Sequence, residues 1–425
     1  MTKDSTATLS LSPQGERCLE NLTSPNPHAR SRAAATLGEL KEQAAVPALI
    51  RALREDINTY VRSAAAEALG HIGDPQAVFP LIDATRDPSS FVRRAAIIAL
   101  GQLGAKEAQV ALIRALGDPN FYVRRAAINA IGKLGVPDLA QMVMPFLNSD
   151  DARLQRTAVT ALRRLGAREA IPRMTEMLAE ALRSPSPRDL PLVKTLVLAL
   201  GQLHAEEAVP ILIEVVRGYV GVRSMASAAL GQIGDQRAGP VLMEALRDRS
   251  ASLRLAALKS LGKLRYREAA PLVRAFLEDE DARQRRVAAL TAACLEDEEA
   301  IPRLVEMALN DESSLVRPVA VEALGKLGRP EALPALLSLV DDPNAYLRAS
   351  LAYALGALDD GRPEVGAALR RLADDPVEHV AEAARRILAR QPVEPLPEAA
   401  MEAATIPAAG MKSEAGGWLS RLLGR

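Results

Sequence analysis

Residues 118–135 read DPNFYVRRAAINAIGKLG, and this stretch decides the fold. Residues 87–104 repeat it as DPSSFVRRAAIIALGQLG, so the two copies lie 31 residues apart. Related segments end at Gly38, Gly70, Gly201, Gly231, Gly262, Gly325 and Gly356, with Arg163 and Ala293 at the same position in two divergent copies. A fixed period of this length is typical of an array of stacked structural repeats.

Each copy has helical periodicity. Val92, Ala96 and Leu103 fall on one apolar stripe, as in an amphipathic helix that ends just after the glycine. A second apolar stretch follows, and in seven copies a proline stands nine positions past the glycine, where the first turn of a helix tolerates it. If a repeat is taken to begin at the Asp-Pro turn, it contains two antiparallel helices of about 11 to 14 residues.

The motif Asp-Pro-x-x-x-Val-Arg-x-x-Ala-x-x-Ala-Leu-Gly-x-Leu-Gly resembles the short bacterial HEAT repeat, also called the phycobilisome-lyase HEAT-like repeat. The resemblance covers about residues 22 to 390. It implies an all-α fold, a right-handed α-solenoid of about 12 HEAT-type helical-hairpin repeats with a period of 31. It further implies that the second helix of each repeat lines the concave surface.

The repeats set the expected domain organisation. We expect a polar N-terminal segment with a capping helix at 1–21 and the solenoid at 22–390, with a Pro-rich insertion near 183–191. A Pro/Ala-rich linker at 391–417 has a composition typical of disorder. Residues 418–425 form a short amphipathic motif.

Aspartate and arginine recur at the repeat period. The pairs are Asp56/Arg62, Asp87/Arg93, Asp118/Arg124, Asp248/Arg254, Asp279/Arg285, Asp311/Arg317 and Asp342/Arg348. A ladder of arginines could bind an anion, but recurrence at the structural period favours a ladder that joins neighbouring repeats. After the insertion, Val193 replaces the arginine, and the helix that carries it is apolar nearly all round, which indicates either wide burial or an exposed apolar strip.

The candidate partner-binding residues lie on two surfaces. On the helix that follows each glycine, offset +13 points to solvent, and four of the later copies carry glutamate there: Glu176, Glu214, Glu244 and Glu306. The resemblance places this acidic stripe inside the concave groove, whereas an ordinary solvated helix face is the alternative. At the C-terminus, four apolar residues share one helical face: Trp418, Leu419, Leu422 and Leu423. This face suits a protein-docking motif or a weak membrane contact, and a frayed tail is the alternative.

Composition excludes several function classes. The 53 Lys and Arg residues balance 53 Asp and Glu residues, and only 3% of the chain is aromatic, so nucleic acid is not an expected partner. The four histidines match no metal or triad spacing, and no phosphate loop or HExxH motif occurs, so we expect no catalytic residues, cofactor or metal. Two distant cysteines and a polar N-terminus indicate a cytoplasmic protein. Nine lysines among the 53 basic residues, with abundant alanine, suggest a bacterial source.

The predicted function is a non-catalytic scaffold or adaptor that binds one or more proteins through its groove and tail, in a signalling, motility or assembly complex. A phycobilin-lyase-like enzyme or chromophore chaperone is the alternative that the resemblance implies. A nucleic-acid-binding HEAT-like protein is a second alternative, which the neutral charge disfavours.

Overall fold

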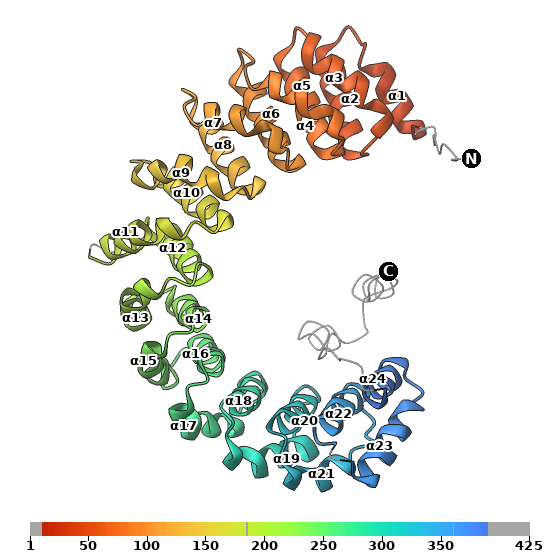
Figure 1. The fold of residues 1–425 in the computed structure, drawn as a ribbon. Helices are drawn as coiled ribbons and strands as arrows, with labels where there is room; N and C mark the ends of the chain where they lie inside the picture. The colour runs from red at the N-terminus through yellow and green to blue at the C-terminus, as the bar shows by residue number, and fades with distance from the viewer. Residues whose placement is uncertain (1–10, 184–185, 360, 390–425) are drawn as a thin grey trace. The chain divides into compact units, whose positions relative to one another are not determined.

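The computed structural model describes residues 11–183, 186–359 and 361–389, and every regular element among them is a helix (Figure 1). Nearly every odd-numbered helix packs on the even-numbered helix that follows it, so helices α1 to α24 form about twelve hairpins. The expected α-solenoid of about 12 hairpin repeats is therefore confirmed. The Asp-Pro turn lies inside each hairpin rather than between hairpins, so the helix with the Val-Arg motif is the second of its pair.

The even-numbered helices carry the Val-Arg position of the repeat or its replacements, and they form one layer within each of the two units described below. They are α2 (Pro27–Glu39), α4 (Thr59–Ile72), α6 (Ser90–Leu103), α8 (Phe121–Leu134), α10 (Ala152–Leu165), α12 (Leu190–Gln202), α14 (Arg223–Ile233), α16 (Ala251–Leu264), α18 (Ala282–Cys294), α20 (Val316–Leu327), α22 (Ala345–Ala357) and α24 (Glu378–Leu388). Their length agrees with the prediction.

The odd-numbered helices form the other layer, and most are shorter than expected. They are α1 (Pro13–Asn21), α3 (Val46–Glu55), α5 (Val78–Ala84), α7 (Gln109–Ala115), α9 (Ala140–Val143), α11 (Ile171–Arg183), α13 (Val209–Gly218), α15 (Gly239–Ala245), α17 (Ala270–Ala275), α19 (Ile301–Asn310), α21 (Leu333–Leu337) and α23 (Pro363–Ala373). From α3 to α21, each follows a short 3-10 turn, such as Pro75–Ala77 before α5, which takes up part of the expected helical length. The recurring proline lies in the first turn, as in α13, where Pro210 follows Val209.

The ends of the even-numbered helices explain why polar residues and glycine recur at fixed positions of the repeat. The Asn120 side chain accepts a hydrogen bond from the Tyr122 amide at 2.9 Å and caps the start of α8. Gly135 ends α8 with φ at 65°, a left-handed conformation that favours glycine. Arg265 takes the same place after α16 with φ at 51°.

The inner glycine of the motif brings neighbouring even-numbered helices close together. A Cβ atom added at Gly101 would lie 2.9 Å from both Cα and Cβ of Ala130 on the next even-numbered helix, and Gly132 faces Ala161 in the same way. Alanine and glycine thus let these backbones approach one another. Within each unit described below, the even-numbered helices lie on the inner side of the curve and the odd-numbered helices on the outer side (Figure 1).

This layer order corrects one prediction. The helices that carry Glu176, Glu214, Glu244 and Glu306 are α11, α13, α15 and α19, which belong to the outer layer. The expected acidic stripe in a concave groove is wrong, because the repeat was cut at the Asp-Pro turn. That cut made the odd-numbered helix the second of its pair, although it is the first helix of the next hairpin.

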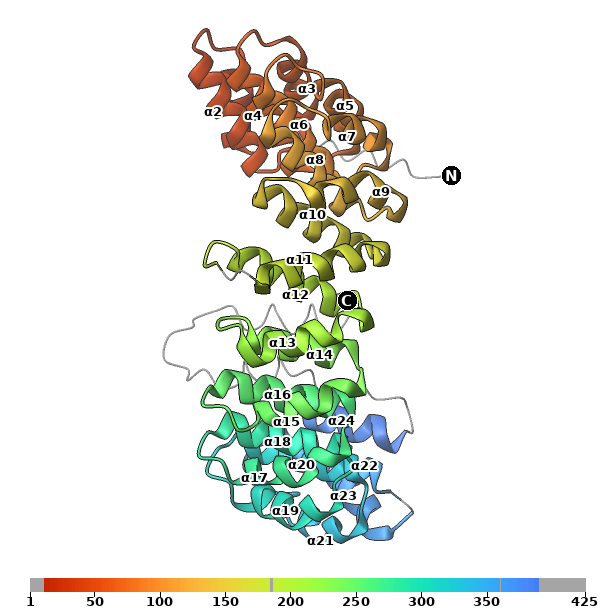
Figure 2. The same cartoon turned by 90° about the vertical axis from the view of Figure 1, so that its left-hand side faces the viewer.

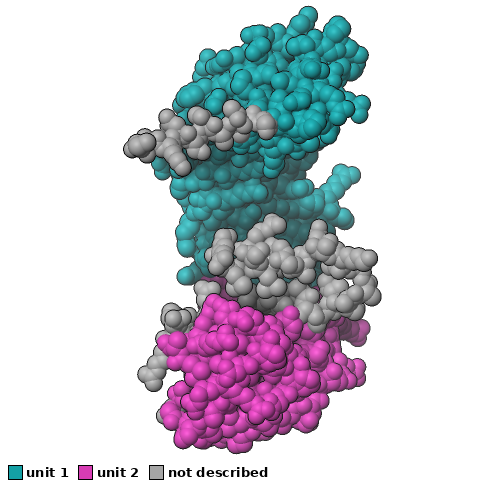
Figure 3. Space-filling view, turned by 90° about the vertical axis from the view of Figure 1, so that its right-hand side faces the viewer, with its two compact units in different colours: residues 1–229 teal, residues 230–425 magenta. Residues whose placement is uncertain are grey.

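The chain divides into two compact units, residues 1–229 and 230–425 (Figure 3). Both consist of stacked hairpins around a core of Ala, Leu, Val and Ile (Figure 2). In the first unit, α12 buries Val193, Leu196, Val197 and Leu200 completely, and only Leu198 of its apolar side chains is exposed. The apolar character of this helix therefore reflects wide burial.

Candidate functional site

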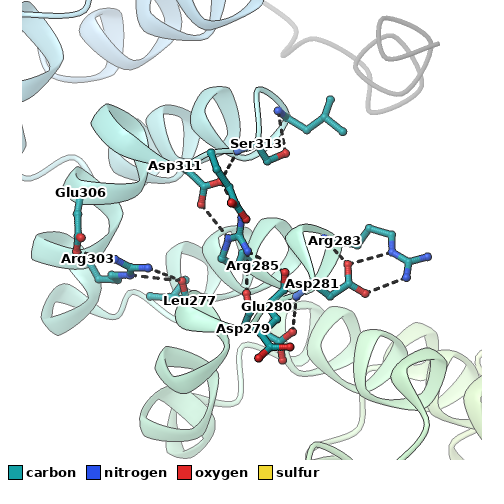
Figure 4. Close-up of polar contacts among 12 residues, drawn as sticks. Leu277, Asp279, Glu280, Asp281, Arg283, Arg285, Arg303, Glu306, Asp311 and Ser313 are labelled. Atoms are coloured by element: carbon teal, nitrogen blue, oxygen red, sulfur yellow. Dashed lines mark hydrogen bonds and ion pairs between the residues drawn. The ribbon is translucent and has the colours of Figure 1, made fainter. Parts of the chain in front are cut away.

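The arginines of the even-numbered helices join one hairpin to the next. Arg93 on α6 donates hydrogen bonds from Nε and Nη2 to the Asp118 carboxylate at 2.7 and 2.9 Å, while its Nη1 donates to the Asp87 carbonyl at 2.9 Å. In the second unit, Arg285 binds Asp311 and the Asp279 carbonyl in the same way (Figure 4). The remaining rungs of this Asp-Arg ladder are Arg30–Asp56, Arg62–Asp87, Arg317–Asp342 and Arg348–Asp375.

The ladder is a structural device, as its period predicted. In the Arg93–Asp118 rung, the side chains are 16% and 10% exposed, so both charges are largely withdrawn from solvent. Burial opposes ionisation of Asp118, but hydrogen bonds from Arg93 and the Asn120 amide outweigh it and hold the pKa of Asp118 below its usual value. The Arg30 and Arg348 guanidiniums lower the pKa values of Asp56 and Asp375 in the same direction.

The ladder has gaps where the sequence departs from the motif. Arg124 donates Nη1 to the carbonyls of Asp118 and Pro119 at 2.8 and 3.0 Å, but Ser149 stands where the next aspartate is expected. In the next repeat, Gln155 replaces the arginine, and Val193 replaces it in the repeat after that. In the second unit, Arg254 donates to Gln284 at 2.8 Å, and Gln284 in turn donates to Asp279.

The four predicted glutamates are exposed, as their offset required. Glu176 accepts from Arg173 at 3.2 Å within α11. Glu306 lies 2.6 Å from Arg303 within α19 (Figure 4). Such exposed pairs are typical of a solvated helix face. The other predicted residues, Trp418, Leu419, Leu422 and Leu423, lie outside the described residues, as do the linker 391–417 and residues 184–185 of the insertion.

A different surface stands out on the inner layer of the first unit. The residue ten positions before the motif glycine is Tyr60 on α4, Phe91 on α6 and Tyr122 on α8, and these rings are 66%, 55% and 49% exposed. On α6 the accessible positions continue through Arg94 and Ile98 to Gln102, at spacings of three and four residues that define one helix face. Leu100 and Ala96 lie on the opposite side of this helix and are buried.

We call this surface the inner stripe. It consists of Phe91, Arg94, Ile98 and Gln102 on α6, Tyr122, Arg125, Asn129 and Lys133 on α8, and Arg153, Arg156, Thr160 and Arg164 on α10. None of these twelve residues is acidic. Because each helix packs its opposite side against the odd-numbered layer, the stripe faces away from that layer.

Aromatic rings and guanidinium groups contact one another along the inner stripe. The Arg125 guanidinium lies 5.5 Å from the Tyr122 ring centroid, and Arg153 lies 4.4 Å from the centroid of Phe121. Arg153 also binds Asp151 at 2.8 Å, and this hydrogen bond is the main reason that the pKa of Asp151 falls to about 2. The Nε of Arg94 is buried without a hydrogen-bond partner among the described residues.

Sequence reasoning missed the inner stripe for two reasons. The aromatic residues were weighed by their number in the whole chain, although three of them recur at one register of the repeat, which was visible in the sequence. The helices that carry them were also placed in the outer layer.

A metal site within the described residues would need several ligating side chains close together. No cluster of three or more His, Cys, Asp or Glu residues there could hold a metal ion. Burial raises the pKa of Asp297 and lowers the pKa of His379, but these two residues belong to different hairpins of the second unit. Across the described ranges, no helix is long and apolar enough to span a bilayer.

Several solved structures are similar to this chain. A phycocyanin lyase complex of CpcE and CpcF from Nostoc sp. PCC7120 matches at 25% identity over 69% of this chain and 99% of that chain, with a TM-score of 0.35. Importin beta matches at 15% identity over 88% of this chain and 62% of that chain, with a TM-score of 0.59. Kap95p bound to RanGDP gives a TM-score of 0.54 at 14% identity, with the same coverage. No curated protein sequence matches.

The importin beta and Kap95p structures show that the solenoid architecture is shared, and at these identities they show the fold alone. The family model for HEAT repeats matches residues 16–101, 48–120, 78–153, 110–189, 181–254, 240–324 and 301–389. These overlapping matches cover nearly all of the described residues. Together with the twelve stacked hairpins and the Asp-Arg ladder, they show that the chain belongs to the HEAT-repeat family.

Proposed function

We propose that the chain is a non-catalytic scaffold or adaptor of the bacterial cytoplasm, and that a partner protein binds to the inner layer of its solenoid. The observation that carries this proposal is the inner stripe. Aromatic and arginine side chains are the residues that protein interfaces favour, yet here Phe91 is more than half exposed. A monomeric chain gains no stability from leaving such side chains in water.

The repeat architecture supports a binding role over a catalytic one. Each hairpin contacts chiefly its neighbours, so the inner layer offers one short row of side chains per repeat rather than a closed pocket. Many shallow contacts along such rows suit an extended protein surface. Catalysis needs convergent groups with matched pKa values, whereas the feature that stands out on the inner layer is a row of exposed aromatic and cationic side chains.

Site-specific photo-crosslinking tests the proposal in the native organism. A photoreactive amino acid replaces Gln102 on the inner layer of the first unit, or Glu214 on the outer layer as the matched control. We expect one protein to crosslink through position 102. The yield of the same crosslinked adduct should be much lower through position 214. Equal labelling at both positions, or no protein adduct at position 102, would remove the inner layer from consideration.

A lyase or chromophore-chaperone role makes a different prediction. The purified full chain would then shift the absorbance spectrum of a bilin on mixing, and the scaffold proposal expects no shift. A spectral shift that saturates at one bilin per chain would overturn the scaffold proposal.

A further inference from the structure

We propose that the inner stripe of α6, α8 and α10 binds an acidic, extended peptide segment of a partner protein, with an apolar side chain at every third position. The inference rests on the proposed scaffold function and names the chemistry of the segment that is bound. Three observations carry it: the charge of the inner stripe, the spacing of its aromatic rings, and the way its guanidinium groups lie against those rings.

Charge is the first observation. The inner stripe holds five cationic side chains besides Arg153, whose charge is balanced by Asp151. They are Arg94, Arg125, Lys133, Arg156 and Arg164. No carboxylate stands at any of its twelve positions, although the whole chain has equal numbers of acidic and basic residues. These cationic groups suit carboxylates on a partner.

Spacing is the second observation. Packed helices lie about 8–10 Å apart. A polyproline-II segment rises about 3.1 Å per residue with three residues per turn, so its residues i, i+3 and i+6 share one side at about 9 Å intervals. One such side chain therefore meets each successive helix. Phe91 and Tyr122 place one ring of the inner stripe on each of α6 and α8, and the Tyr60 ring on neighbouring α4 lies 6.4 Å from the Phe91 ring between centroids, so an apolar seat continues beside the stripe.

Ring contacts at Phe121 and Tyr122 are the third observation, and at these two rings they favour a peptide over single-stranded nucleic acid. Base stacking requires free aromatic faces. Here Arg153 lies over the Phe121 ring at 4.4 Å, and Arg125 lies within 6 Å of both Phe121 and Tyr122. These guanidinium groups are held beside the rings, where they can pair with carboxylates that flank an apolar anchor.

Peptide display against the purified full chain tests the inference. A library of random 15-residue peptides is selected in the presence of excess oligouridylate. We expect the selected peptides to be acidic, with apolar residues three apart. Synthetic versions should bind at least tenfold more weakly to F91A and to R125E, and within twofold of the unaltered protein to E214K on the outer layer. Circular dichroism of each variant verifies folding, which these exposed positions should not disturb.

Four results would overturn the inference. The selected peptides could lack acidic residues, or their binding could survive both F91A and R125E. Oligouridylate could bind the inner stripe and displace the peptides, which would make nucleic acid the ligand. The fourth concerns residues 391–411, which carry three glutamates and no basic residue. If charge reversal at Glu394, Glu398 and Glu402 tightened peptide binding tenfold, the occupant would be this segment of the chain itself.

The two proposals can fail separately. If a partner crosslinks at position 102 but its binding does not depend on an acidic peptide, the scaffold proposal stands and this inference alone is rejected.

Discussion

Replacing Asp118 by asparagine should weaken the joint between two hairpins of the first unit. The Asp118 carboxylate accepts hydrogen bonds from Arg93 Nε at 2.7 Å, from Arg93 Nη2 at 2.9 Å and from the Asn120 amide at 2.8 Å. Asparagine keeps the shape but has one acceptor oxygen and no charge. Its amide group would also point a donor at the guanidinium, which has only donors to offer.

The expected decrease in the free energy of unfolding lies between two limits. Exposed ion pairs contribute about 0 to 1 kcal/mol, whereas breaking a buried pair by removing one partner costs about 3 to 5 kcal/mol. Arg93 and Asp118 are 16% and 10% exposed and form a two-pronged pair, so we expect D118N to lower the free energy of unfolding by about 2 to 3 kcal/mol.

Urea unfolding followed by circular dichroism measures the loss, and hydrogen exchange locates it. Because repeats are coupled mainly to their neighbours, exchange should accelerate in α6 to α8 before it does elsewhere. The matched control is D83N, since Asp83 lies 3.7 Å from Arg54 with both side chains more than half exposed, and it should cost less than about 1 kcal/mol. If D118N cost no more than D83N, the ladder would not stabilise the stack as argued.

Four further predictions concern the packing, the helix ends and the ladder. G101A should lower the free energy of unfolding of the first unit by about 1 to 3 kcal/mol in urea, because the new methyl would meet Ala130 at 2.9 Å. G117A should be neutral or slightly stabilising, because the new methyl would meet only the Arg114 carbonyl, at an ordinary contact distance of 3.6 Å. R265G should raise the midpoint by the equivalent of about 1 kcal/mol, since only glycine adopts φ near 51° without strain; an unchanged midpoint would contradict this. S149D should add an ion pair with Arg124 to the Asp-Arg ladder and slow amide hydrogen exchange in α8 and α10. Hydrogen exchange that is unchanged or faster would show that the missing carboxylate does not limit stability at this position. Because the ladder aspartates with shifted values have a pKa below that of the unfolded chain, their contribution is complete at neutral pH and is lost as pH falls below about 4; urea midpoints measured from pH 7 to pH 3 should stay level and then drop, by less in D118N.

Much of the fold could be predicted, because each recurring residue of the repeat has a local structural cause. The 31-residue period, the proline in the first turn and the ladder arginines each have a local physical cause, and each is found in the structure. Less of the candidate site could be predicted from the sequence. The exposed offset of Glu176 and Glu306 was correct, because it follows from helical geometry, but the side of the solenoid on which they lie was not.

The sequence by itself determined that the chain is an all-helical array, since no hairpin can bury its apolar stripe without neighbours. It also determined the ends of some even-numbered helices, such as α8 between the Asn120 cap and the left-handed Gly135. Only the tertiary structure decided which helices pair and which layer is inner. A repeat can be cut at any of its turns without changing its period, whereas the close approach of Gly101 to Ala130 draws one layer together and curves each unit around it. That curvature puts Phe91 and Arg125, rather than the glutamates, on the inner surface.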